Sequence, residues 1–362
     1  MAGSKDPAVF VWGVSTPQTN PRVFLFFQTT RKNWQEITKG PDMPDPIAFV
    51  DAIAATKADT RALLVGNGFS HQYFNYENLL KNAGLETNQS LLSLFETFKT
   101  TDFEVVIRTL EDAALVEERY IKLSRALALR KEANKLRRAL VHAIRAVHPN
   151  FHTDVWGIPS ALAFISDFSM LFTLNYDFLL HWVRLRDTKK FTDGFGLGED
   201  NGEFRGPFKE GARCNVYNIH GGLHLFADAD GSVHKRVGEP AIIEAIGKTI
   251  VQDKRLPLYV AEGTASQKLS KIFGSVYLRH CFNKIDECEG AFFIFGHSAD
   301  RNDEHIYDKI FRSNIEHLYY CIHRPTAGKI AERNAELARY KAHSDSKIEF
   351  TFVDSDSANV WD

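Results

Sequence analysis

Four short apolar segments, each ending in small or polar residues, constrain the fold of this chain most strongly. They are RALLVGNGFS (61–70), MLFTLNYD (170–177), VYNIHGG (216–222) and AFFIFGHSAD (291–300). A short apolar run that stops at a turn is typical of a strand buried in a parallel sheet. Segments with helical spacing separate these runs, and further strands are expected at 318–322 and 348–353. The sequence therefore predicts an α/β fold with a doubly wound, mostly parallel, Rossmann-like sheet.

A long helical segment interrupts this pattern between the first two strands. No proline occurs between Pro46 and Pro149, and apolar residues recur with a period near 3.6. We expect a helical insertion at 75–149 with two or three long helices, including one from Arg119 to His148, and with Asp102 as an N-cap. The core is then formed by 59–74 and 150–362, and residues 1–58 are an N-terminal lead-in.

Two stretches of the lead-in are distinct. Residues 1–40 are expected to be irregular or to form a short hairpin, because their apolar stretches are short and interrupted. Residues 47–60 have the spacing of a helix.

Charge and cysteine content exclude several classes of protein. The 44 Lys and Arg residues nearly balance the 46 Asp and Glu residues, giving a formal net charge of −2, unlike a polybasic nucleic-acid coat. The four cysteines form no CxxC pair, which argues against a zinc ribbon and a secreted disulfide scaffold. No apolar run reaches the 18 or so residues of a membrane span. We expect a cytoplasmic protein without a membrane segment.

The segment from Arg119 to His148 carries nine basic residues and one acid, Glu132. A solvated helix face explains this pattern most simply. A surface for a partner protein, for a second copy of the chain or for nucleic acid is the alternative.

The first motif is a Gly-x-Gly turn, with Gly66, Asn67, Gly68, Phe69 and Ser70 following the strand at 61–65. Glycines let a backbone approach a phosphate closely, and a helix N-terminus supplies N–H groups. The third glycine of the GxGxxG dinucleotide fingerprint is absent. A tight turn without a ligand is the alternative.

The next two motifs place Asn175, Asp177 and His220 after strands. Asn175 and Asp177 have the chemistry to hold a ribose hydroxyl or a water, or else they form an Asx turn and cap a helix. His220 has the side chain best suited to proton transfer near neutral pH, and Gly221 leaves open space beside it. A structural histidine is the alternative. His220 and His224 do not have a helical HExxH context, so no metal site is expected.

The fourth motif is Gly296, His297 and Ser298, which can donate hydrogen bonds to a phosphate or ribose. All four motifs follow predicted parallel strands. Ligands of open α/β sheets bind outside the carboxyl ends of the strands. The four motifs together therefore predict a nucleotide site.

Taken in order, the four motifs resemble the sirtuin family, and more closely the bacterial sirtuin-like proteins of antiphage defence that hydrolyse NAD. The resemblance covers roughly residues 60–355. It implies that the first turn, with Gly66, Gly68 and Ser70, binds phosphate, although Asn67 and Phe69 replace the usual small residues of that turn.

The resemblance also implies roles for the other motifs. Asn175 and Asp177 match residues near the nicotinamide ribose, and His220 matches the catalytic histidine. Gly296 and Ser298 match the loop that holds the adenosine ribose and phosphates. One aspartate after the last strand, at position 354 or 356, is expected near adenine.

One departure from the family affects the expected activity. The four-cysteine zinc ribbon that the resemblance associates with protein-deacylating sirtuins is missing. We therefore expect an NAD⁺ hydrolase that uses NAD as its substrate, needs no metal and releases nicotinamide and ADP-ribose, with a role in antiphage defence through NAD depletion. His220 would act as general base, Asn175 would position the ribose or a water, and Asp177 would stabilise charge.

Two alternatives remain open, a non-catalytic sensor of NAD or ADP-ribose and an NAD-dependent protein deacylase. The expected partners are a second copy of the chain, or an ATPase or other defence protein bound through the helical insertion.

Overall fold

The computed structural model describes residues 45–74, 79–195, 203–205, 214–228, 230–236, 241–260 and 263–362. Residues 45–362 form one compact unit, and the expectation for residues 1–40 lies outside the described residues. The strands of the central sheet are β1 (Ile47–Ala48), β2 (Arg61–Val65), β3 (Met170–Thr173), β4 (Phe191–Thr192), β6 (Cys214–Asn218), β10 (Glu289–Phe295), β11 (Asn314–Ile322) and β12 (Glu349–Asp354).

The order of the strands confirms a parallel sheet that grows in two directions. The order is β1-β12-β11-β10-β2-β3-β6-β4, and every pairing is parallel. From β2 the sheet extends through β3, β6 and β4 on one side, and the later strands β10, β11 and β12 extend it on the other. The order therefore reverses between β2 and β10, which is where open α/β sheets bind ligands.

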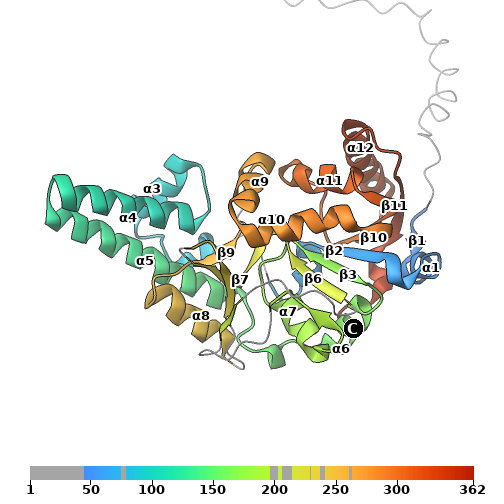
Figure 1. The fold of residues 1–362 in the computed structure, drawn as a ribbon, viewed down its shortest axis with the longest axis horizontal. Helices are drawn as coiled ribbons and strands as arrows, with labels where there is room; N and C mark the ends of the chain where they lie inside the picture. Colours follow the sequence, from blue (N-terminus) through green and yellow to red (C-terminus); the bar gives the residue numbers. More distant parts are fainter. Residues whose placement is uncertain are drawn as a thin grey trace, which may run out of the picture. The chain divides into compact units, whose positions relative to one another are not determined.

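Helices cover both faces of this sheet (Figure 1), with α6 and α7 on one side and α10, α11 and α12 on the other. The sheet and these helices together make a mixed α/β protein compatible with a Rossmann-like fold. The helices are α1 (Phe49–Ala54), α2 (Asn67–Ser70), α3 (Gln89–Phe98), α4 (Phe103–Tyr120), α5 (Leu123–Val147), α6 (Ile158–Ile165), α7 (Leu179–Arg184), α8 (Ile242–Val251), α9 (Ala265–Gly274), α10 (Val276–Asn283), α11 (Glu304–Phe311) and α12 (Ala327–His343).

The start of the described chain belongs to the core rather than to a lead-in. The strand β1 pairs with β12, and the ring of Phe49 packs 5.2 Å from that of Phe164 and 5.9 Å from that of Phe293. The helix expected over 47–60 is confined to α1. A strand of two residues leaves no periodicity in a sequence, so the boundary near residue 58 was placed too late.

A second, antiparallel sheet was not expected. It has the order β5-β8-β7-β9, with β5 (Glu203–Arg205), β7 (Gly221–Ala227), β8 (Val233–Arg236) and β9 (Pro257–Tyr259). The chain passes into it directly at Gly221, where a loop was expected. Gly221 has a φ of +73°, and a Cβ there would lie 2.1 Å from the carbonyl oxygen of Leu258. This glycine therefore admits strand β9, and the space at its own Cβ position is filled by Leu258 rather than left open.

The helical insertion consists of α3, α4 and α5 (Figure 1). The Asp102 carboxylate accepts a hydrogen bond of 2.8 Å from the Glu104 N–H, which confirms the predicted N-cap of α4. The prediction of a single helix from Arg119 to His148 was wrong, because the chain reverses at Ile121 between α4 and α5. No Gly or Pro marks this turn, and the ion pair between Arg130 and Glu118 joins the two helices across it.

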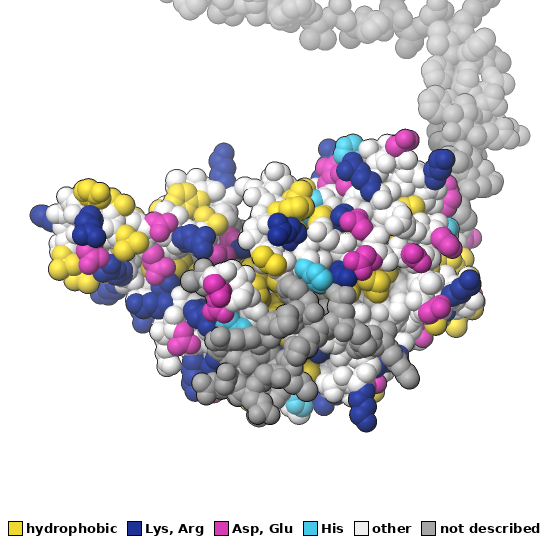
Figure 2. Space-filling view, viewed as in Figure 1, with side chains coloured by type: hydrophobic (Ala, Val, Ile, Leu, Met, Phe, Trp, Pro, Cys, Tyr) yellow, Lys and Arg dark blue, Asp and Glu magenta, His cyan; other side chains and the backbone are white. Residues whose placement is uncertain are grey.

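Apolar side chains gather at the tip where α4 and α5 meet (Figure 2). Tyr120 is 82% exposed, and its apolar neighbours in the same turn are also exposed. Exposed apolar patches of this kind mark interaction surfaces in many proteins. The expectation that the insertion binds a second copy of the chain or a partner stays a prediction. None of the helices that the structure describes is long and apolar enough to cross a membrane.

We expect His148 to make the folded state sensitive to acid. Its buried ring accepts a 3.0 Å hydrogen bond at Nε2 from the Phe178 N–H, and Nδ1 lies 2.7 Å from the Pro149 carbonyl. Burial lowers the pKa of His148 from 6.5 to about 4. The unfolded chain therefore binds a proton between pH 6.5 and 4 that the folded chain does not. Neutral His148 therefore stabilises the folded state fully above pH 6.5. About 3 kcal/mol of the free energy of unfolding is lost as the pH falls towards 4.

Urea unfolding at pH 7.5 and pH 4.5 would measure this loss, with His148→Gln as the variant that cannot titrate. The free energy of unfolding should fall more steeply with acid in the wild-type chain than in the variant. Equal losses in both proteins would contradict the prediction. The other buried histidines contribute equally to both proteins and so cancel in the comparison.

Candidate active site

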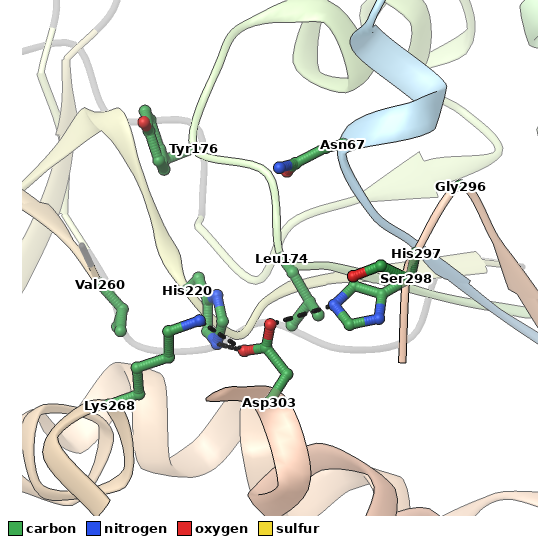
Figure 3. Close-up of a pocket in the computed structure, with 10 residues that line it drawn as sticks. All are labelled: Asn67, Leu174, Tyr176, His220, Val260, Lys268, Gly296, His297, Ser298 and Asp303. Atoms are coloured by element: carbon green, nitrogen blue, oxygen red, sulfur yellow. Dashed lines mark hydrogen bonds and ion pairs between the residues drawn. The ribbon is translucent and has the colours of Figure 1, made fainter. Parts of the chain in front are cut away.

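The four predicted motifs meet at one edge of the central sheet. The strands that carry them, β10, β2, β3 and β6, are consecutive neighbours and run parallel, so the loops at their carboxyl ends lie side by side. A pocket opens there (Figure 3), lined by Asn67, Leu174, Tyr176, His220, Val260, Lys268, Gly296, His297, Ser298 and Asp303. Five of the predicted site residues therefore line one pocket. The expectation that the motifs share one edge of the sheet is confirmed.

The glycines of the first turn serve backbone packing. The N–H of Gly66 donates to the Phe295 carbonyl at 2.9 Å, and that of Gly68 donates to the Gly296 carbonyl at 2.7 Å. A Cβ on Gly68 would lie 2.5 Å from the Cα of Gly296. These two amides are therefore engaged by the neighbouring loop, and a bound phosphate would have to use other groups. Of this turn, Asn67 is the residue that lines the pocket.

The remaining members of the first turn lie inside the protein. Phe69 is fully buried, and its carbonyl accepts a 2.6 Å hydrogen bond from the Trp361 indole N–H. Ser70 is also fully buried. Both residues therefore support the turn from behind.

Asn175 and Asp177 form a buried network behind the pocket wall. The Asn175 amide donates to the Gly66 carbonyl at 2.9 Å and to the Ser70 hydroxyl oxygen at 3.1 Å. Its own Oδ1 is buried, without a hydrogen-bond partner among the described residues. An unpaired buried acceptor is uncommon in a native protein and points to a role beyond packing.

Asp177 caps helix α7, because its carboxylate accepts a 2.6 Å hydrogen bond from the Leu179 N–H. Burial raises the pKa of Asp177 to about 6, against the lowering effect of hydrogen bonds from Ser70 and Leu179. The capping alternative for Asp177 is thus what the structure shows. Neither Asp177 nor Asn175 is among the residues that line the pocket.

His220 joins the two sheets and faces the pocket. It follows β6 directly, and its carbonyl accepts a 2.9 Å hydrogen bond from the Val260 N–H, which ties it to the end of β9. The residue is 4% exposed, and its Nε2 has no hydrogen-bond partner within the described part of the chain. Burial lowers the pKa of His220 to about 3, opposed by the nearby Asp303 carboxylate. The ring is therefore neutral, and its Nε2 is left unpaired.

Asp303 is the point on which the charged side chains of the pocket converge (Figure 3). Its Oδ1 lies 2.7 Å from Nζ of Lys268 and 3.9 Å from Nε2 of His220, and its Oδ2 lies 3.2 Å from Nε2 of His297. Burial opposes the ionised form, but the hydrogen bond from His297 and the charge of Lys268 outweigh it, so the pKa of Asp303 lies well below its usual range. Asp303 is therefore an ionised carboxylate next to the candidate base.

The His297 ring is held in one orientation. Its Nδ1 accepts a 3.1 Å hydrogen bond from the Ala299 N–H and lies 2.7 Å from the Tyr307 hydroxyl, so Nε2 carries the proton that faces Asp303. The His297 carbonyl accepts a hydrogen bond from the Tyr320 hydroxyl. The loop after β10 is thus fixed from three sides.

A second hollow begins where the first pocket ends. Gly296 lines both, and the second hollow is also lined by Gly68, Arg324 and Asp356 near the end of β12. Asp356 pairs with His323, their side chains lying 2.5 Å apart. The two hollows therefore lie on either side of the contact between Gly68 and Gly296.

The sequence analysis assigned neither Lys268 nor Asp303 to the site. Lys268 comes from α9, in a segment without a recognisable motif, so no local signal could have indicated it. Asp303 directly precedes α11, a position where an aspartate usually caps the helix. In the structure its side chain makes no cap hydrogen bond, and it turns to Lys268 and His297 instead.

Fold and site together define a doubly wound α/β protein with a pocket at the carboxyl ends of its central strands. Residues 63–361 match the family described as Domain of unknown function (DUF4917), and the chain belongs to this family. Comparison with curated proteins finds no significant match. Since the family description names no activity, the function has to be inferred from the pocket.

Proposed function

We propose that the chain is an NAD⁺ hydrolase that cleaves the nicotinamide–ribose bond and releases nicotinamide and ADP-ribose. The observation that carries the proposal is His220, a buried neutral imidazole whose unpartnered Nε2 faces a pocket at the switch point of a doubly wound sheet. Buried histidines usually satisfy their ring nitrogens, and pockets at such switch points commonly bind nucleotides.

The proposed reaction needs one base and no general acid. The bond between C1′ of the ribose and the nicotinamide nitrogen breaks, and its electron pair leaves with nicotinamide, which is already a cationic leaving group. The oxygen of a water molecule forms the new bond to C1′, and His220 Nε2 accepts the proton from that water. Charge at C1′ develops as in glycoside hydrolysis.

Asp303 supports this step. Its carboxylate stands 3.9 Å from His220 Nε2, so it would stabilise the imidazolium that forms when His220 accepts a proton. Lys268 and His297 keep Asp303 ionised and fix its position. Asp303 is thus proposed for the charge-stabilising role that the sequence assigned to Asp177.

The two hollows fit a dinucleotide that crosses the sheet edge. The nicotinamide ribose would occupy the pocket with His220, and the adenosine half would extend past Gly296 into the hollow lined by Arg324 and Asp356. Ser298 and Asn67 line the first pocket, where the part of the dinucleotide that joins its two halves would pass. Both have polar side chains that can bind phosphate or ribose oxygens.

Incubation of the purified chain with NAD⁺, followed by mass spectrometry of the products, tests the proposal. We expect nicotinamide and ADP-ribose in equal amounts. Stabilisation against heat by NAD⁺ without any product would favour the sensor instead. Release of nicotinamide only in the presence of an acyl-lysine peptide would favour a deacylase.

Asn175 lies behind the pocket wall, where its amide holds the Gly66 carbonyl and the Ser70 hydroxyl. It is proposed as a positioning residue whose unpartnered Oδ1 receives a ribose hydroxyl or the attacking water once the bound ligand has displaced that wall. Asn175→Asp keeps an acceptor there and loses the donor to Gly66, whereas Asn175→Ala loses both. We expect roughly 10²-fold slower turnover for the alanine variant and a smaller loss for the aspartate variant. Measurement of kcat and KM for both Asn175 variants, with thermal unfolding as the control for folding, shows whether their losses differ. Equal losses would assign the effect to the turn at Gly66.

The proposed biological role, antiphage defence by NAD depletion, derives from the sirtuin-like resemblance. It predicts that the NAD content of cells carrying the chain falls after phage infection. The content should stay constant in infected cells that carry His220→Ala.

A further inference from the structure

Three unpaired imidazole nitrogens are buried together at the back of the pocket. Both ring nitrogens of His305 and Nε2 of His220 have no hydrogen-bond partner among the described residues. The two rings stack with their centroids 5.8 Å apart and their planes 17° from parallel. His305 is 7% exposed and His220 is 4% exposed, so the protein shields both from most of the solvent. Each unpaired buried nitrogen is destabilising unless something binds it.

We propose that His220, Asp303 and His305 form a binding site for one divalent transition metal ion of the Zn²⁺ class. One ligand atom from each residue lies within 4.8 Å of the others. Two imidazoles and one carboxylate, with a further position open to the pocket, are a donor set that Zn²⁺ prefers. The structure offers this site without an ion.

The ligand atoms of His220 and Asp303 lie close to the separation that a bound ion requires, and those of His305 lie within 4.8 Å of both. Ligand atoms in a tetrahedral zinc site lie about 3.3 Å apart, since each stands roughly 2.0–2.1 Å from the metal. His220 Nε2 and Asp303 Oδ1 are 3.9 Å apart. Small rotations of these side chains would close the gap.

Lys268 and His297 do not exhaust the binding capacity of Asp303. An ionised carboxylate has about four lone-pair positions, and these two side chains use one on each oxygen. The Lys268 ammonium does repel a cation. We therefore expect moderate affinity, tighter when Lys268 swings away or an anion binds at the open position.

A second histidine cluster fits a metal less well. His181, His224 and Asp193 also lie within 4.8 Å of one another. Asp193 is already paired with both Arg184 and Lys235, whose Nζ stands 2.6 Å away, and Nδ1 of His181 lies 3.0 Å from the Arg184 guanidinium. Two buried cations around one carboxylate oppose a third positive charge.

A third cluster is satisfied without an ion. Asp308 lies 3.0 Å from His343, and Glu304 pairs with Arg339 at 3.2 Å. His343 is exposed to solvent. These two clusters serve as internal controls for the site at His305.

Metal binding would switch off the proposed reaction, a consequence that rests on the proposed function. The ion would take the Nε2 lone pair of His220, which the hydrolysis needs as its base. Zn²⁺ should then inhibit nicotinamide release by the wild-type chain, and a chelator should restore it. The metal site itself is tested without NAD, so its failure and that of the hydrolase proposal are distinguishable.

Titration with Co²⁺, followed by its visible absorption and by calorimetry, tests the site directly. We expect one equivalent to bind to the wild-type chain with an intense tetrahedral spectrum. His305→Phe and His305→Gln should weaken binding by more than the roughly 10–100-fold that the loss of an outer-shell partner costs. The second His305 variant keeps the test valid if the first one misfolds, and circular dichroism checks the folding of both.

The matched controls are His224→Phe and His343→Phe, which should bind Co²⁺ as the wild-type chain does. Absence of binding to the wild-type chain would overturn the proposal. So would binding that survives both His305 variants, or that is lost in His224→Phe alone.

Discussion

Replacement of His220 by alanine is expected to slow nicotinamide release by about 10²–10⁴-fold, the usual contribution of a general base. The side chain is the neutral imidazole in the pocket whose Nε2 has no hydrogen-bond partner in the described part of the chain. Its removal takes away the proton acceptor and the partner of Asp303. The fold should tolerate the change, because the hydrogen bond from the Val260 N–H to the His220 carbonyl does not involve the side chain.

His142→Ala is the matched control for this experiment. His142 is an exposed histidine on α5 whose Nδ1 lies 2.9 Å from the Asn82 carbonyl, and it is not among the residues lining the pocket. Its loss should leave the rate of nicotinamide release within a factor of about two. Steady-state kinetics with both variants, together with thermal unfolding, gives the comparison. Equal rates for His220→Ala and the wild-type chain would remove His220 from the mechanism.

Asp303→Asn refines the same experiment. The amide keeps the size of the side chain but loses the charge that would stabilise the imidazolium of His220. We expect a smaller loss of rate than for His220→Ala, and a double variant no slower than His220→Ala alone, since the two residues act together.

The strands and their loops could be predicted because buried parallel strands leave a local trace in the sequence. The apolar run before Gly66 and the one before Gly296 each stop at a turn, and both became paired central strands. The loops then had to meet, because parallel neighbours end at the same edge. Asn67, His220 and Ser298 were therefore expected at one edge of the sheet, and all three line the pocket.

The other parts of the site depend on contacts between segments that are distant in the sequence. Lys268 lies on α9, which follows strand β9 of the small antiparallel sheet, and that sheet was not expected from the sequence. His305 lies on α11, after β10, and its ring stacks on that of His220, which follows β6. No spacing rule connects residues 85 positions apart (305 − 220 = 85).

The glycines show a different limit of sequence reasoning. A Gly-x-Gly turn indicates that something approaches the backbone closely, but it does not reveal what. At Gly68 the approaching group is the backbone of Gly296, and at Gly221 it is the carbonyl of Leu258. We predicted a phosphate because the glycines indicate a close approach to the backbone. That indication does not distinguish a ligand from a neighbouring loop.

The contact between Gly68 and Gly296 leads to a large expected effect on stability. A Cβ on Gly68 would lie 2.5 Å from the Cα of Gly296, and a Cβ on Gly296 would lie 2.6 Å from the backbone nitrogen of Phe69. Backbone atoms cannot rotate away as side chains do, so each substitution has to push two loops apart. Overpacking of this kind costs about 1–3 kcal/mol or more.

Gly296→Ala should be the worse of the two variants. Gly296 has a φ of +70°, and this left-handed conformation costs a residue with a Cβ roughly 1–2 kcal/mol in addition to the clash. Because the same contact separates the two hollows, both variants should also weaken NAD⁺ binding, which calorimetry would show as a raised Kd. Urea unfolding would measure the loss of stability directly.

Gly328→Ala is the control that separates a clash from a general effect of adding a methyl group. Gly328 lies in the first turn of α12, and a Cβ there would meet no atom within 4 Å. Alanine should therefore leave the free energy of unfolding unchanged or raise it by roughly 0.5–1 kcal/mol, because glycine is a poor helix residue. A Gly68→Ala chain as stable as the Gly328→Ala chain would show that the loops after β2 and β10 can separate. The two hollows would then not be fixed relative to each other, and the dinucleotide path across Gly296 would lose its support.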